Sequence, residues 1–122
     1  MAAPNIVNVT SIYGKTMGVG LTTSLTTDIL TCSADKVLKI NTILVSNIDG
    51  TNAADATVYF YDSSTAARYS LANTVNIPAD STLVIVGKDN PIYLEESDQI
   101  EGGASASNDL QIIISYEEID DA

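Results

Sequence analysis

Hydrophobic residues recur along the chain in short runs, and polar turn residues separate one run from the next. The longest run, KVLKINTILVSNI at residues 36–48, places Leu38 and Ile40 on one parity and Ile43 and Val45 on the other. Successive side chains of a strand point to opposite faces. The change of parity therefore predicts a long strand that contains a bulge, or one that is buried on both faces.

A second run alternates more simply. In ATVYFY, residues 56–61, Val58 and Phe60 share one face of a predicted strand, whereas Tyr59 and Tyr61 share the opposite face. Alternation of this kind is typical of a strand whose two faces lie in different environments. The remaining runs predict strands at residues 5–10, 68–77, 82–86, 92–94, 99–107 and 110–119. In the last of these, Ile112 and Ile114 are expected to face one way and Ile113 the other.

Turn signals divide these runs, and no segment has a helical period over three turns. The Asp-Gly pair in DGTNAAD, residues 49–55, predicts a hairpin. Gly14-Lys15-Thr16 is expected to form a turn after a first strand at residues 5–10. We therefore predict one all-β domain over residues 1–122, an antiparallel β-sandwich, jelly-roll or immunoglobulin-like, of about eight strands. We expect residues 1–10 to form either an N-terminal arm or the first strand.

Composition and charge agree with a folded domain and exclude some partners. Of the 122 residues, 45% are hydrophobic and 17% are charged, which is enough apolar area for a core. The formal charge is −11, from 16 acidic and 5 basic residues. A protein needs clustered basic residues to bind a nucleic acid or an anionic membrane, so we expect neither as a partner. Cys32 is the single cysteine, which excludes an intrachain disulfide.

The stretch SIYGKTMGVG, residues 11–20, contains fragments of two nucleotide-binding motifs. A phosphate-binding loop would need a glycine at Val9 and a helix after Thr16, and the chain has neither. A dinucleotide fingerprint would need its third glycine at Thr23. We predict no nucleotide or other cofactor, and we interpret the glycines as supplying positive φ or close backbone packing.

Candidate chemistry is sparse elsewhere. The chain has no His, the commonest general base, and Cys32 therefore has no imidazole to activate it. Glu95 and Asp98 could in principle act as a glycosidase pair, but nothing in the sequence fixes their separation. Three acidic groups could supply oxygen ligands for a cation, although none matches a calcium loop: Asp49, Asn52 and Asp55; Glu95, Glu96 and Asp98; Glu117, Glu118, Asp120 and Asp121. We predict a protein that is not an enzyme, and we assign no catalytic, cofactor or metal residues.

Protein contact is the function class that the residues favour. The chain has six Tyr and no Trp, and Tyr59 and Tyr61 lie opposite the Val58 face, so they pack on a partner or cover the second side of the sandwich. An extended N-terminal arm could pair with the edge strand of a neighbouring subunit. The predicted interface residues are Asn5, Ile6, Val7, Tyr59 and Tyr61.

Three segments together cover nearly the whole chain: NIVNVTSIYGKT, VLKINTILVSNIDGTNAADATVYFYDSS and NIPADSTLVIVGKDNPIYLEESDQIEGGASASNDLQIIISYEEI. They resemble a family of small virion structural proteins of tailed bacteriophages, notably those that infect marine cyanobacteria. The resemblance implies a particle component without catalysis that is assembled in the host cytoplasm. It transfers no site residues.

Three roles are compatible with this resemblance. The first is a capsid decoration or cement protein that braces the outer shell and binds the major capsid protein, because the acidic surface suits the outside of the shell. The second is a component of the neck, tail, baseplate or fibre attachment, in contact with other virion proteins. The third is a carbohydrate-binding module for host adhesion, which the absence of Trp weakens. A homo-oligomer with closed symmetry is expected, with a trimer favoured.

Overall fold

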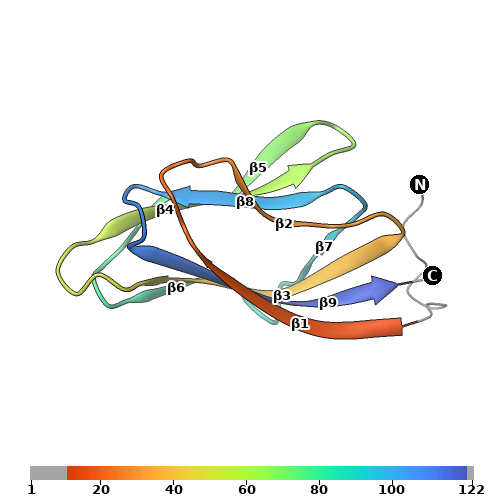
Figure 1. Ribbon diagram of the computed structural model, residues 1–122, viewed down its shortest axis with the longest axis horizontal. Coiled ribbons are helices and arrows are strands. Elements are labelled where there is room, and N and C mark those ends of the chain that lie inside the picture. Colours follow the sequence, from red (N-terminus) through yellow and green to blue (C-terminus); the bar gives the residue numbers. More distant parts are fainter. Residues whose placement is uncertain (1–10, 121–122) are drawn as a thin grey trace.

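Two antiparallel sheets pack face to face in the computed structural model, which describes residues 11–120 (Figure 1). Sheet A has the strand order β1 (Ser11–Gly20), β9 (Leu110–Asp120), β3 (Lys36–Asn47) and β6 (Thr82–Val86), and β7 (Ile92–Leu94) also pairs with β3. Sheet B has the order β2 (Thr27–Thr31), β8 (Gln99–Ala104), β4 (Ala54–Asp62) and β5 (Ala67–Ile77). The predicted all-β sandwich is confirmed, with nine strands among the described residues.

The connections distinguish between the two predicted types of sandwich. The chain changes sheet at every connection except β4 to β5 and β6 to β7. As a result, strands distant in sequence become neighbours, such as β1 with β9 and β2 with β8. This order is that of a jelly roll; an immunoglobulin-like sheet would instead contain hairpin-connected neighbours of its first strands.

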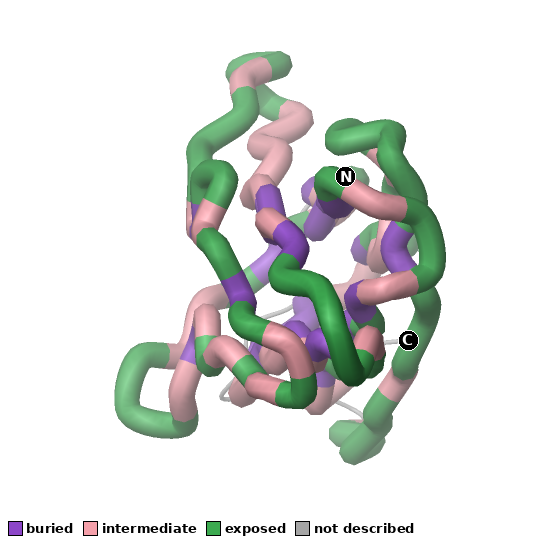
Figure 2. The backbone as a smooth tube through the Cα atoms, turned by 90° about the vertical axis from the view of Figure 1, so that its left-hand side faces the viewer, coloured by how far each residue is buried: buried purple, intermediate pink, exposed green. Residues whose placement is uncertain are grey.

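The core lies between the two sheets. Ile112 and Ile114 of β9 are fully buried beside Val45 and Ile43 of β3, their cross-strand partners. Figure 2 shows buried segments running through the interior and exposed segments in the outer loops. The alternation predicted for β9 is confirmed, because Ile113 between the two buried residues is 37% exposed. Each fully buried Ile or Val contributes about 1.5–3 kcal/mol to stability.

The change of parity in β3 comes from the first of the two predicted causes, a bulge. The register of β3 against β9 shifts between Ile40 and Thr42, opposite Tyr116 and Ser115. The bulge inserts one extra residue, so the alternation of side chains between the two faces of the sheet shifts by one position. Ile40 before it and Ile43 after it can therefore both point into the core, and both are fully buried.

The predicted Asp-Gly hairpin is wrong. Residues 48–53 connect β3 of sheet A to β4 of sheet B, so the flanking strands do not pair with each other. The polar turn itself forms, because Asp49 Oδ1 accepts hydrogen bonds from the N–H groups of Thr51 (2.8 Å) and Asn52 (3.2 Å). These backbone donors hold the pKa of Asp49 below its usual value. The turn formed as expected, but it did not determine which strand pairs with β4.

The predicted turn at Gly14-Lys15-Thr16 is also wrong. These residues lie within β1, which pairs with β9 without a register shift from Ser11 opposite Asp120 to Gly20 opposite Gln111. None of the glycines among the described residues has positive φ. The glycines of β1 therefore sit in ordinary extended backbone, and the strand predicted at residues 5–10 lies outside the described part of the chain.

Candidate functional site

The structure places two of the five predicted interface residues. Tyr59 and Tyr61 lie on β4 and are partly buried on the outer face of sheet B, since Val58, directly before Tyr59, is fully buried in the core. The other three, Asn5, Ile6 and Val7, precede the described residues. Contact of Tyr59 and Tyr61 with a partner therefore stays a prediction.

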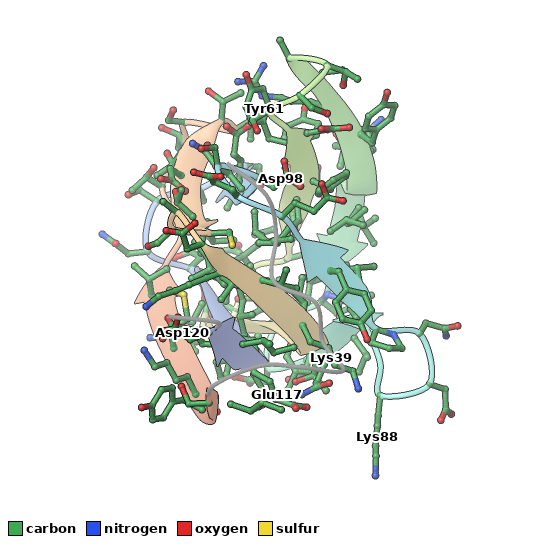
Figure 3. All side chains as sticks on the ribbon, turned by 90° about the vertical axis from the view of Figure 1, so that its right-hand side faces the viewer. Lys39, Tyr61, Lys88, Asp98, Glu117 and Asp120 are labelled. Atoms are coloured by element: carbon green, nitrogen blue, oxygen red, sulfur yellow. The ribbon has the colours of Figure 1, made fainter. Side chains whose placement is uncertain are left out.

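The ring of Tyr61 is already engaged within the chain. The Arg68 guanidinium carbon lies 5.2 Å from the centroid of this ring, in cation–π geometry. Arg68 also donates a hydrogen bond from Nε to the carboxylate of buried Glu101, which raises the pKa of Arg68. Figure 3 shows Tyr61 at the opposite end of the molecule from Lys39 and Glu117. On the outer face of sheet B, Arg68 therefore interacts with both the Tyr61 ring and the Glu101 carboxylate.

An apolar cleft that sequence reasoning missed lies between the edge of sheet B and β7. It has a volume of about 150 Å³ and is lined by Phe60, Tyr69, Leu71, Ile92 and Tyr93. The rings of Phe60 and Tyr69 stack with centroids 6.3 Å apart. Tyr69 and Tyr93 are exposed, so the cleft offers aromatic edges and faces to solvent. Such a surface suits an apolar group or a sugar ring.

A polar groove lies on the outer face of sheet A. Its volume is about 390 Å³, and it is lined by Lys39, Asn41, Thr42, Lys88, Ser115 and Glu117. Asn41 donates a hydrogen bond from Nδ2 to Glu117 Oε2 at 3.0 Å, so part of the lining is satisfied internally. In Figure 3, Lys39 and Glu117 lie together, whereas Lys88 projects away from the loop that follows β6. The groove therefore presents both signs of charge and selects neither anions nor cations strongly.

An exposed apolar row crosses the same outer face. Ile113 of β9 lies opposite Leu44 of β3, and Leu44 lies opposite Val84 of β6. Val84 is 60% exposed. The adjacent row is polar, where Ser46 and Thr82 share a hydrogen bond of 3.1 Å. We name Ile113, Leu44 and Val84 the apolar row. Large apolar side chains aligned on an outer face beside polar residues have the anatomy of a protein-contact surface.

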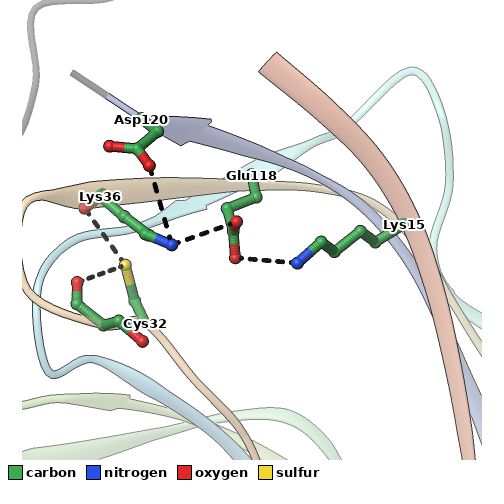
Figure 4. Close-up of polar contacts among 6 residues, drawn as sticks. Lys15, Cys32, Lys36, Glu118 and Asp120 are labelled. Carbon is green, nitrogen blue, oxygen red and sulfur yellow. Dashed lines mark hydrogen bonds and ion pairs between the residues drawn. The ribbon is translucent and has the colours of Figure 1, made fainter. Parts of the chain in front are cut away.

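One end of sheet A carries a chain of ion pairs (Figure 4). Glu118 contacts Lys15 Nζ at 3.3 Å and Lys36 Nζ at 3.2 Å, and Lys36 Nζ lies 3.8 Å from Asp120. The hydrogen bond from Lys36 to Glu118 raises the pKa of Lys36. Three strands, β1, β3 and β9, are joined in this way. The lysine of the apparent nucleotide motif therefore has an intramolecular ion partner.

The single thiol is unsuited to nucleophilic chemistry. Cys32 is buried, and its Sγ donates to the carbonyl oxygen of Lys36 at 3.2 Å. Burial is the largest influence on this thiol and raises the pKa of Cys32 to about 11. The thiolate, which is the reactive form, is therefore scarce near neutral pH.

Asp121 lies outside the described residues, and the other acidic candidates do not assemble into a shared site. No group of three or more His, Cys, Asp or Glu side chains that could hold a metal ion occurs within residues 11–120. Asp98, one member of the proposed glycosidase pair, is buried, and its carboxylate accepts hydrogen bonds from the N–H groups of Ser63 and Glu95. This carboxylate links the β4–β5 hairpin to the turn before β8. Its hydrogen-bonding capacity serves the fold.

Comparisons with known proteins add no assignment to these surfaces. Among residues 11–120 there is no helix of the length and apolarity needed to cross a bilayer. No protein-family model and no curated protein matches this chain.

Proposed function

We propose that this chain is a non-enzymatic structural protein of a tailed-bacteriophage virion, and that it decorates the capsid by binding the major capsid protein on the outer shell. The observation that carries the proposal is the resemblance of residues 5–16, 37–64 and 76–119 to small virion structural proteins. The resemblance involves nearly the whole chain and contributes no catalytic residue.

The geometry supports a role in contact with a surface. The apolar row lies on the outer face of sheet A, where a flat partner can reach it, and Val84 gains most from being covered because it is 60% exposed. The formal charge of −11 disfavours a place beside packaged DNA and suits the outside of a shell. In this proposal sheet A faces the capsid.

Co-sedimentation with purified heads and with purified tails, both lacking this protein, tests the proposal. We expect saturable binding to heads and none to tails. Replacing Val84 by Ser should weaken head binding about tenfold, because the buried apolar area falls at the contact. Thr82→Ser is the matched control, since it changes the polar row of the same strand and keeps its hydroxyl. Binding to tails alone would move the protein to the neck, tail or fibre base. If Val84→Ser bound heads as tightly as the unchanged chain, the apolar row would not be part of the contact; if Thr82→Ser weakened binding as much as Val84→Ser, the loss would not come from buried apolar area.

One observation favours a second candidate, a carbohydrate-binding role in host adhesion. The apolar cleft exposes Tyr69 and Tyr93, and tyrosine rings stack well on sugar rings. Binding of host-surface polysaccharide that is lost in Tyr69→Ala but kept in Tyr13→Ala would replace the decoration proposal. Tyr13 is a suitable control because it is similarly exposed on a different sheet.

A further inference from the structure

The sandwich has one long and regular sheet edge. At the other edge of sheet A, β6 and β7 have only five and three residues. In sheet B, β2 has five residues and a register shift, and β5 contains Thr74 at a φ of 52° beside two register shifts. Short strands and bulges are the usual protection of an edge against pairing. Among the described strands, β1 alone is an edge that is both long and unbroken, with ten residues in one register.

The backbone groups that β1 directs to its free side can be assigned. Leu21, directly after β1, donates its N–H to the carbonyl of Leu110 on β9 at 2.8 Å. Because these groups alternate along a strand, the odd-numbered residues of β1 bond to β9. The N–H and C=O groups of the even-numbered residues point away from β9, and no strand within residues 11–120 pairs with them: Ile12, Gly14, Thr16, Gly18 and Gly20.

We propose that β1 is the docking edge for β1 of a second copy of this chain, paired antiparallel about a two-fold axis at Thr16. In this register Ile12 lies opposite the partner's Gly20, Gly14 lies opposite the partner's Gly18, and the two Thr16 residues face each other. All five outward-directed residues of each copy then have a partner. The two A sheets join into one continuous sheet, and the only long regular edge of the described chain disappears.

The side chains of β1 match each other in this register. Tyr13 is 53% exposed and comes opposite the partner's Val19, which is 43% exposed, and pairs of an aromatic with a β-branched residue stabilise sheets. Lys15 comes opposite the partner's Met17, so no like charges meet. An axis at Lys15 would place two lysines opposite each other, and an axis at Met17 would leave Ile12 without a partner. Self-complementarity therefore favours a second copy as the occupant, with the axis at Thr16.

Net charge makes the pairing dependent on salt. Each copy carries a formal charge of −11, whereas β1 itself contains one basic residue and no acidic residue. The repulsion is therefore long-range, and it is screened as the Debye length falls from about 30 Å at 0.01 M salt to about 8 Å at 0.15 M. We expect dimerisation to strengthen with salt. The pairing gives a dimer instead of the expected trimer, and it does not depend on the virion role.

Sedimentation of the full chain at several salt concentrations, with variants at Thr16, tests this inference. Thr16→Pro removes the central free N–H but no hydrogen bond to β9, so the dimer dissociation constant should rise at least about tenfold. Thr16→Val keeps the N–H and the strand propensity and should still dimerise. Far-ultraviolet circular dichroism checks that both variants fold. A wild-type monomer at every salt concentration, a trimer, or equal dissociation constants for the two variants would overturn the inference.

Cysteine cross-linking tests the register even if Thr16→Pro fails to fold. Paired residues of an antiparallel sheet have Cα atoms about 5.5 Å apart, within the range of about 4.4–6.8 Å that a disulfide spans. Thr16→Cys should therefore form a disulfide-linked dimer on mild oxidation. Gly14→Cys alone should not, because the two Gly14 residues would lie more than about 13 Å apart. A mixture of Gly14→Cys and Gly18→Cys chains should cross-link. Dimers of Gly14→Cys alone, or none with Thr16→Cys, would contradict this register.

Discussion

Replacing Gly103 by Ala should lower the free energy of unfolding by about 3 kcal/mol or more. Gly103 is buried in β8, a central strand of sheet B. A Cβ atom at this position would clash with the carbonyl oxygen of Ser24 and would lie 2.8 Å from Leu25 Cα. Both obstacles are backbone atoms of the segment that leads into β2. They cannot rotate away as a side chain can, so the segment itself must move.

Urea denaturation followed by circular dichroism measures this loss against a matched control, Gly14→Ala. Gly14 also lies in a strand, but a Cβ atom there would have nothing within 4 Å. We expect Gly14→Ala to change the free energy of unfolding by no more than about 0.5 kcal/mol, with a gain as easily as a loss. Similar values for the two variants would show that the contact of β8 with Ser24 and Leu25 is not as close as described.

Replacing Asp98 by Ala should cost about 3 kcal/mol, the second large effect. The side chain of Asp98 is nearly inaccessible, and its Oδ1 accepts hydrogen bonds from Ser63 N–H at 3.0 Å and Ser63 Oγ at 3.3 Å. Oδ2 accepts a hydrogen bond from the N–H of Glu95 at 3.1 Å. Removal of the carboxylate leaves these donors without an acceptor at a partly buried junction. The turn before β8 and the β4–β5 hairpin are then no longer linked.

Two further variants separate this effect from the loss of a charge. Asp98→Asn keeps an acceptor for Ser63 but places an amide N–H₂ near the N–H of Glu95, so we expect an intermediate loss. Asp89→Ala removes an exposed carboxylate from the loop after β6 and should be almost neutral. Thermal unfolding of the three variants provides the comparison. If Asp98→Ala and Asp89→Ala had equal midpoints, the proposed linking role of Asp98 would be wrong.

Strands with strong periodicity could be predicted from the sequence. The alternation of Ile112, Ile113 and Ile114 predicted which side chains are buried. The change of parity in residues 36–48 predicted either a bulge or burial on both faces, and the structure has the bulge. By contrast, β1 was missed because Gly14, Lys15 and Gly18 leave no apolar alternation to detect. Its extended form is imposed by ten residues of pairing with β9, nearly a hundred positions away.

Strand pairing was not predictable from local signals. Asp49 and Gly50 form the expected polar turn, but turn chemistry does not specify whether the next strand stays in the same sheet. The same limit applies to the surfaces. Ile113, Leu44 and Val84 lie far apart in sequence, and only the registers of β9, β3 and β6 align them. The exposure of Tyr69 and Tyr93 could not be predicted from the neighbouring sequence, because tyrosine occurs both at the edge of a core and on a surface.

The most direct test of the decoration proposal is the number of copies of this protein per purified virion, measured by quantitative mass spectrometry against the major capsid protein. A shell-bracing protein must occur in numbers comparable with the capsid protein, and this is the result that we predict. A copy number that is a small fraction of the capsid protein's, or absence from the particle, would contradict a decoration role.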